Sequence, residues 1–227
     1  QILSAVDKFF INETFNTHST LNDLSVSIIA CKIIQCTNNG DGGGIYYRGS
    51  GNVSIIDSIF FGCACNQHGG SAYTSGETSS ITRSVGKKST SKWCSAFYQR
   101  GDTSTDMKEN SIVECTSVGG FLSSGQSNGF ATAKVSNGSL LSTDVEVCGF
   151  ENWGGSPFSF SFITYWQCIG LGVHDLHIAS ADTYETGNIC FGNCSESNYQ
   201  CLVAHGTHII RNSIFASKSE SFGQYPR

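Results

Sequence analysis

Proline and charged residues are scarce in this chain of 227 residues. Only 2 prolines stand beside 26 glycines, so the turns must be built from glycine and asparagine. Charged residues make up 14% of the chain, the formal net charge is -5, and no lysine or arginine cluster occurs. We exclude nucleic acid as a partner, because basic residues would have to neutralise its phosphates. The composition is typical of a β-rich protein that is long enough to bury a core.

A signal peptide and a membrane-spanning segment are also missing from the pattern. Residues 1–11 have no basic start and carry Asp7 and Lys8 where a hydrophobic segment would be, so Gln1 is expected to be a mature end. The uncharged stretch 152–173 is long enough to span a bilayer. It contains three serines and four glycines, however, and Phe158 to Phe162 alternates with period two, which indicates a strand.

Cysteine, by contrast, is abundant, and its 11 copies are too many for a typical reduced cytosolic protein. We therefore predict a secreted protein or an extracellular surface protein. The cysteines lack C-x2-C spacing and nearby histidines, so we predict no metal and no other cofactor. The disulfide candidates are Cys36, Cys63, Cys65, Cys190 and Cys194. Four sequons give the glycosylation candidates Asn12, Asn52, Asn137 and Asn193.

An internal repeat organises the chain. The stretch from Val53 to Thr74 repeats the plan of a segment that begins at Val26, 27 residues earlier. In each copy a cysteine, Cys36 or Cys63, and a glycine turn separate two apolar strand-like runs. Later copies are aligned at three places. Ile81 corresponds to Ile55, and Phe215 corresponds to Phe60. The stretch from Ser139 and Leu140 to Cys148 keeps the nine-residue interval that separates Ser27 from Cys36. In the copy that contains Ile81, we expect residues 86–88 to be an insertion that forms a protruding loop.

This irregular repeat predicts an all-β fold, a right-handed parallel β-helix of about seven turns. A single turn cannot bury its own apolar row, whereas stacking places Ile28, Ile55 and Leu140 in interior rows of parallel strands about 4.8 Å apart. We expect residues 1–20 to be an N-terminal cap and residues 21–227 to be the β-helix. A sandwich or a propeller also uses short strands, but adjacent apolar pairs such as Ile28-Ile29 fit strict two-period alternation poorly.

The repeats combine a GG-[IA] element, at Gly43-Gly44-Ile45 and at Gly69-Gly70 with Ala72, with an F-x-x-C or F-x-N element at Phe60 to Cys63 and Phe191 to Asn193. This combination resembles the right-handed, pectin-lyase-like β-helix repeats of polymorphic outer-membrane-protein-type adhesins, including the cysteine-bearing versions on protists such as trichomonads. The resemblance covers residues 21–215. It implies an adhesin-like protein that is secreted or located on the cell surface.

The residues themselves offer no convincing catalytic set. Polysaccharide lyases and glycosidases need two or three carboxylates on one exposed face. The candidates Asp144 with Glu146 and Asp175 with His177 fit a solvated strand face equally well. Five aromatic residues are candidates for a carbohydrate platform or for core stacks: Trp93, Tyr98, Trp153, Tyr165 and Trp166.

We therefore predict a non-enzymatic β-helix protein that acts as a scaffold for adhesion or filament assembly. A carbohydrate-active enzyme is the alternative. The expected partner is a protein or a surface glycan, and self-association through uncovered β-helix ends is also expected. Equal repeat positions further predict a disulfide between Cys36 and Cys63 on adjacent turns, with two stacked free thiols as the alternative.

Overall fold

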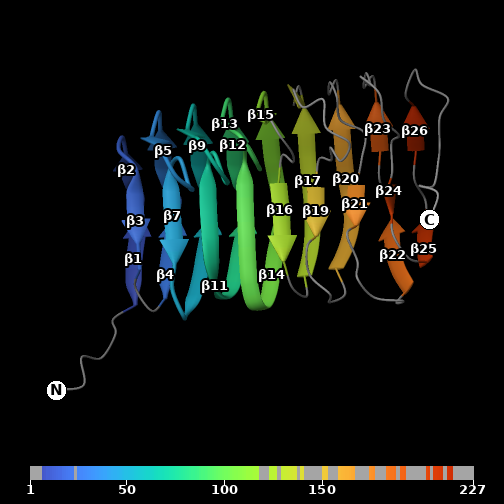
Figure 1. Ribbon diagram of the computed structural model, residues 1–227, viewed down its shortest axis with the longest axis horizontal. Helices are drawn as coiled ribbons and strands as arrows, with labels where there is room; N and C mark the ends of the chain where they lie inside the picture. Colours follow the sequence, from blue (N-terminus) through green and yellow to red (C-terminus); the bar gives the residue numbers. More distant parts are fainter. Residues whose placement is uncertain are drawn as a thin grey trace.

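The computed structural model describes residues 7–22 and 25–117 with their side chains, and the backbone of strands β16 to β26 among the residues beyond. All the strand pairs are parallel, and the described residues contain no helix. Successive turns follow one another along the long axis of the molecule, in the colour order from blue to red (Figure 1). The fold is therefore an all-β parallel solenoid, as predicted.

The described residues were also searched for a helix long and apolar enough to cross a membrane, and none was found.

The strands form four faces of the solenoid, which we name A to D in chain order from Val26. Face A consists of β1 (Lys8–Ile11), β4 (Val26–Ile29), β8 (Asn52–Ile56), the end of β11 (Ala72–Thr82), the middle of β14 (Phe97–Val113), the starts of β17 (Gly129–Ser136) and β20 (Phe158–Trp166), β22 (Thr183–Gly187) and β25 (Thr207–Arg211). Face B consists of β2 (Thr14–Phe15), β5 (Lys32–Ile34), β9 (Ile59–Phe61), β12 (Val85–Lys87), the ends of β14, β17 and β20, β23 (Cys190–Gly192) and β26 (Ile214–Ala216).

The other two faces are narrower. Face C is a separate sheet of β6 (Thr37–Asn38), β10 (Ala64–Cys65), β13 (Thr90–Ser91), β15 (Thr116–Ser117) and β18 (Ser139–Leu140). Face D consists of β3 (Ser19–Leu21), β7 (Ile45–Arg48), the starts of β11 and β14, β16 (Ser123–Gln126), β19 (Phe150–Asn152), β21 (His174–Leu176) and β24 (Val203–Ala204).

The strand register confirms the first repeat. Val26 pairs with Val53 and Ile28 with Ile55, and Ile55 in turn pairs with Ile81. Alternate residues of these strands are buried, because successive side chains of a strand point to opposite faces. The apolar core therefore consists of columns of side chains inside the solenoid. Its largest fully buried members are Tyr47, Phe60, Phe97, Ile28, Ile33, Ile45, Ile55 and Ile81.

The loop predicted at residues 86–88 is wrong. Gly86 and Lys87 lie in β12, which pairs with β9 and β14. A Cβ atom at Gly86 would lie 3.4 Å from the ring of Phe97, and that ring packs edge to face on Phe60 at 5.7 Å between centroids. The same Cβ atom would lie 3.1 Å from Ser71 Oγ and 3.3 Å from Ala96 Cβ, so a side chain at Gly86 would crowd these two residues inside the solenoid.

Two alignments of later copies are also corrected. Ser139 pairs with Thr116 on face C, which is the column of Thr37, so Ser139 and Leu140 do not correspond to Ser27 and Ile28. The column of Ile28 continues instead to Met107. Cys148 lies outside the described residues.

The alignment of Phe215 with Phe60, in contrast, is confirmed. Phe215 pairs with Phe191, and the same column leads back through Tyr165, Val135 and Ile112 to Phe60. The register of face B therefore persists to β26.

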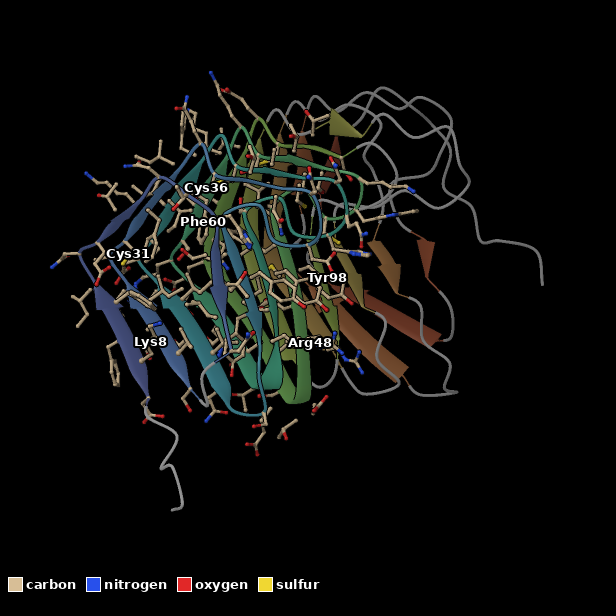
Figure 2. All side chains as sticks on the ribbon, turned by 60° about the vertical axis from the view of Figure 1, so that its left-hand side comes forward. Lys8, Cys31, Cys36, Arg48, Phe60 and Tyr98 are labelled. Atoms are coloured by element: carbon tan, nitrogen blue, oxygen red, sulfur yellow. The ribbon has the colours of Figure 1, made fainter. Side chains whose placement is uncertain are left out.

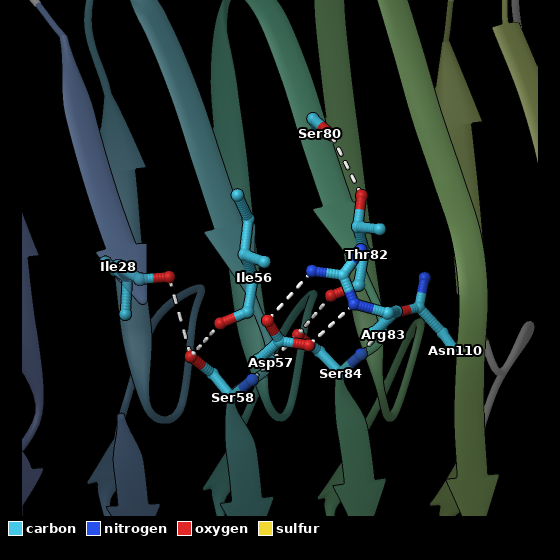
Figure 3. Close-up of polar contacts among 9 residues, drawn as sticks. All are labelled: Ile28, Ile56, Asp57, Ser58, Ser80, Thr82, Arg83, Ser84 and Asn110. Atoms are coloured by element: carbon cyan, nitrogen blue, oxygen red, sulfur yellow. Dashed lines mark hydrogen bonds and ion pairs between the residues drawn. The ribbon is translucent and has the colours of Figure 1, made fainter. Parts of the chain in front are cut away.

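Buried polar side chains connect successive turns at the corner between faces A and B (Figure 3). The Ser58 hydroxyl accepts from Cys31 N–H at 3.1 Å, Ser84 Oγ accepts from Ser58 N–H at 3.2 Å, and Asn110 Oδ1 accepts from Ser84 N–H at 2.9 Å. The residues that precede Cys31, Ser58, Ser84 and Asn110 all have a positive φ, such as 54° at Ala30 and 52° at Asp57. The side chains thus satisfy backbone donors that the left-handed corner removes from the strand ladder.

Polar side chains also enter the interior. Thr74 and Ser79 hydroxyls lie 2.7 Å apart, and Gln99 Nε2 donates to Ser79 Oγ at 3.0 Å. All three residues are fully or almost fully buried. Mutual hydrogen bonding lowers the cost of removing these groups from water.

Residues 7–117 form about four turns, and the predicted seven-turn count, right hand and N-terminal cap remain predictions. Within the segment predicted as a cap, β1, β2 and β3 pair in parallel with β4, β5 and β7 and so form a solenoid rung. Phe9 and Ile11 of β1 are exposed. Self-association through the C-terminal end remains a prediction, because residues 217–227 lie outside the described residues.

The core columns generate a stability prediction. Changing Ile55 to Ala should lower the free energy of unfolding by about 2–5 kcal/mol, because a fully buried side chain is removed from a stacked column. The matched variant Ile59→Ala should change it by no more than about 0.5 kcal/mol, since Ile59 is 44% exposed. Urea unfolding followed by circular dichroism measures both variants. Equal midpoints for the two would show that Ile55 is not a core residue.

Candidate binding face

Strand alternation on face D separates a buried set from an outward set of side chains. In β7, Ile45 and Tyr47 are fully buried, whereas Tyr46 is half-buried and Arg48 is exposed. The register repeats this arrangement, because Ile45 pairs with Ala72 and Ala72 with Phe97. The outward residues of β7, β11 and β14 therefore form straight columns along the solenoid axis.

The first outward column is a ladder of three tyrosines, Tyr46, Tyr73 and Tyr98. The ring centroids of Tyr46 and Tyr73 are 5.1 Å apart with planes at 21°, and those of Tyr73 and Tyr98 are 4.8 Å apart with planes at 9°. Each ring covers the face of the next, so the ladder presents ring edges and hydroxyls to a ligand. The Tyr46 and Tyr73 hydroxyls donate to no other described residue.

The second outward column contains Arg48, Ser75 and Arg100. Both arginines are exposed, and Ser75 is half-buried. Among the residues described with side chains, neither arginine forms an ion pair. Tyr98 and Arg48 are the labelled members of the two columns (Figure 2).

An aspartate and a histidine lie beside the tyrosine ladder. They come shortly before Tyr46 and Tyr73 in the sequence. The backbone N–H and the Nδ1–H of His68 donate to Asp41 Oδ1 at 3.0 and 2.8 Å, and the His68 ring lies 5.2 Å from the Tyr98 ring. Burial alone would raise the pKa of Asp41, but these hydrogen bonds outweigh it and lower the pKa. The carboxylate of Asp41 is therefore held in its charged form by His68.

The pKa of Tyr73 is raised, first by burial and then by the Asp41 carboxylate, while the cations of Arg48 and Arg100 act in the opposite direction. The Tyr73 hydroxyl therefore keeps its proton at neutral pH and is available as a hydrogen-bond donor.

Sequence analysis identified only part of this face. Tyr98 belongs to the ladder, and Trp93 forms a parallel bridge with His68 beside it. Tyr165 and Trp166 lie on face B, and Trp153 lies outside the described residues. Tyr46 and Tyr73 were missed, although an apolar residue followed by tyrosine stands shortly after a glycine pair in both copies.

The catalytic candidates are not assembled among the described residues. Asp144, Glu146 and His177 lie outside them, and Asp175 is placed only by its backbone in β21, where it pairs with Glu151. No group of three or more His, Cys, Asp or Glu side chains that could hold a metal ion is found in residues 7–22 and 25–117.

Of the cysteine candidates, Cys36 and Cys63 lie where the repeat placed them. They occupy equal positions on adjacent turns, because the following residues, Thr37 and Ala64, are paired. Both thiols are buried and donate to backbone carbonyls, and burial raises the pKa of Cys63 to about 12 and also raises that of Cys36. Cys115 is in the same column, whereas Cys94 is not, because Ser89 takes that place.

Cys65 lies apart from the Cys36–Cys63 pair. Its thiol donates to the carbonyl of His68 at 3.2 Å, and burial raises its pKa to about 11. None of the six cysteines among residues 7–117 forms a disulfide in the structure. Cys190 is placed only by its backbone in β23, and Cys194 lies outside the described residues.

Two of the four sequons are described. Asn12 is exposed at a corner with φ of 57°, and Asn52 is exposed at the start of β8, where its Oδ1 accepts from the Thr78 hydroxyl at 2.7 Å. Both side chains are accessible to a modifying enzyme. Asn137 and Asn193 lie outside the described residues.

The stacked thiols generate a redox prediction. Under oxidising conditions Cys36 and Cys63 should form a disulfide, because paired parallel strands are about 4.8 Å apart and a disulfide tolerates Cα separations of about 4.4–6.8 Å. Closing a loop of 27 residues should add roughly 3 kcal/mol in the chain-entropy model. Peptide mapping of unfolded, unreduced protein checks this prediction. Alkylated Cys36 and Cys63 would contradict it.

The Asp41–His68 pair generates a pH prediction. Because the folded-state pKa of Asp41 is lowered, its contribution to stability is present above the unfolded pKa of about 3.9 and is lost as the pH falls through the folded value. Between about pH 5 and pH 2, the melting temperature of the wild type should therefore fall further than that of Asp41→Asn. The control Asp102→Asn, at an exposed position, should follow the wild type. A parallel decline for Asp41→Asn and the wild type would show that Asp41 gains nothing from His68.

Comparison of the chain with protein-family models, with curated proteins and with solved structures finds no match.

Proposed function

We propose that this chain is a non-enzymatic β-solenoid of the cell surface or the secreted fraction, and that it adheres to surface glycans through face D. The observation that carries the proposal is the outward array of face D, where a stacked tyrosine ladder runs beside two arginines without an ion-pair partner among the described residues. Tyrosine, arginine and tryptophan are enriched at the energetically dominant positions of protein–protein interfaces, and the tyrosine hydroxyl and the arginine guanidinium can also donate hydrogen bonds to sugar hydroxyls.

The rigidity of the support favours binding. Each tyrosine stands on a strand whose inward neighbours are fully buried, and the rings hold one another in parallel planes. A ligand therefore meets side chains that are already ordered, so less conformational entropy is lost on binding. An extracellular location agrees with the high cysteine content and with two exposed sequon asparagines, Asn12 and Asn52.

The test attaches a bulky polymer to face D, so that a ligand can no longer reach the tyrosine ladder. The chain carrying Ser75→Cys is labelled with polyethylene glycol maleimide, which should spare Cys36, Cys63 and Cys65 because they are buried. Glycan-array binding should fall at least tenfold, since the polymer covers the tyrosine ladder. A matched block at Lys32→Cys, an exposed residue of β5 on face B, should leave binding unchanged. Equal binding by both labelled proteins, or no array binding by the wild type, would contradict the proposal.

A carbohydrate-active enzyme remains the second candidate because of one observation. Glu151 and Asp175 occupy paired positions on adjacent strands of face D, further along the column of the tyrosines. Two neighbouring carboxylates are the minimum that glycoside hydrolysis requires. Release of reducing ends from polysaccharides by the wild type, lost in Glu151→Gln and Asp175→Asn, would favour the enzyme over the adhesion scaffold.

A further inference from the structure

The second outward column of face D places two cations around one hydroxyl. Arg48, Ser75 and Arg100 are in register on three successive strands, so the two arginines are two rungs, or about 10 Å, apart at Cα. Ser75 occupies the rung between them. Two long, exposed side chains can therefore lean from both sides over the same serine.

Neither arginine has an ion-pair partner among the described residues. The Asp41 carboxylate, which accepts two hydrogen bonds from His68, interacts with Arg48 electrostatically but forms no ion pair with it. Glu77 and Asp102 are exposed just past the end of the column and form no ion pair with either arginine. Both guanidinium groups are thus exposed to the solvent without a direct ionic contact to a described residue.

Tyr73 lies between Tyr46 and Tyr98 in the ladder, on the strand that also carries Ser75. It precedes Ser75 by two residues on the same face of the strand, and its hydroxyl makes no hydrogen bond to another described residue. The register therefore places two hydroxyl-bearing residues beside two arginines on the outer surface of face D. Arginine forks match the planar geometry of a carboxylate and the oxygens of a sulfate.

We infer that Arg48, Ser75 and Arg100 form a clamp for one anionic group, a sulfate or a carboxylate carried by a glycan, whose sugar hydroxyls bond along the edge of the tyrosine ladder. The exposed carboxylates Glu77 and Asp102 disfavour a dense polyanion at this site, so an isolated anionic group on a hydroxyl-rich chain fits better. This inference rests on the proposed function, since it names the ligand of face D.

The experiment uses three probes with one backbone: dextran sulfate of low substitution, carboxymethyl dextran of low substitution, and neutral dextran. Retention of each probe on the immobilised chain is measured by surface plasmon resonance at rising sodium chloride concentration. The wild type should bind at least one anionic dextran at least tenfold more tightly than neutral dextran, and added salt should weaken this binding. The difference between the sulfated and carboxymethylated probes identifies the anion.

Three variants assign the binding to the clamp. Arg48→Ala with Arg100→Ala should weaken anionic binding at least tenfold, because hydrogen bonds to charged groups are lost. Arg48→Lys with Arg100→Lys keeps the charge but loses the fork geometry, and it should weaken binding less. The matched control, Lys32→Ala with Lys87→Ala, removes the same charge from face B and should leave binding unchanged. Circular dichroism verifies that each variant is folded.

The outcomes separate the inference from the proposed function. Equal binding of neutral and anionic dextrans, blocked by polymer at Ser75→Cys, would overturn the clamp while keeping face D as a glycan-binding surface. Equal loss in Arg48→Ala with Arg100→Ala and in the control Lys32→Ala with Lys87→Ala would show that net charge governs binding, which also overturns the clamp. A phosphorylated peptide is injected as a fourth probe, and tighter binding of this peptide than of both anionic dextrans would assign the arginines to a protein partner and reject the glycan.

Discussion

The in-register stacking of parallel strands is the constraint on which every other feature of this structure depends. Each residue lies about 4.8 Å from its counterpart on the next turn, both in the interior and on the surface. A side chain is therefore acceptable only if it tolerates nearly the same side chain, or a complementary one, directly above and below it. Ile28, Ile55 and Ile81 meet this condition by packing, and Tyr46, Tyr73 and Tyr98 meet it by stacking.

Corners meet the same condition with hydrogen bonds. At the corner between faces A and B, non-glycine residues adopt positive φ on successive turns, which costs roughly 1 kcal/mol or more for each residue. The buried ladder of Ser58, Ser84 and Asn110 is compatible with this backbone, because each side chain accepts from the backbone N–H of the turn before. On the outside of this corner, Asp57 and Arg83 pair in a bidentate contact at 2.7 and 2.8 Å. Opposite charges, rather than equal ones, occupy adjacent rungs there.

These same rules explain how much of the fold could be predicted from the sequence. Where a column consists of identical apolar residues, as for Ile28 and Ile55, the repeat alone gave the correct register. The predicted register failed where the copies were aligned on their cysteines. In the third turn Ser89 occupies the place of the cysteine, and Cys94 lies in the turn that contains glycine in the other copies, with φ of 56°. A serine can occupy the buried place of a cysteine, since both are small and both donate to backbone carbonyls.

The interior polar residues and most of the binding face were not predicted from the sequence, for a different reason. Thr74, Ser79 and Gln99 resemble surface residues in the sequence, and only their contact across the interior makes burial tolerable. The tyrosine ladder could have been found, since Tyr46 and Tyr73 follow matching glycine pairs 27 residues apart. Before Tyr98 the place of the glycine pair is taken by Cys94 and Ser95, so the third member is hidden from a search for that motif.

The outward columns of the solenoid differ in whether their polar groups are already satisfied. On face A, the Asp106 carboxylate accepts from Lys108, and at the corner Arg83 is occupied by Asp57. A ligand that bound there would have to displace an existing partner, which reduces the net gain in free energy. On face D the sequence Arg48, Ser75, Arg100 along the column avoids the repulsion of like charges on adjacent rungs, because a neutral residue separates them. That spacing keeps the cations stable on the surface yet unpaired among the described residues, and it leaves their hydrogen-bonding capacity available to a molecule outside the chain.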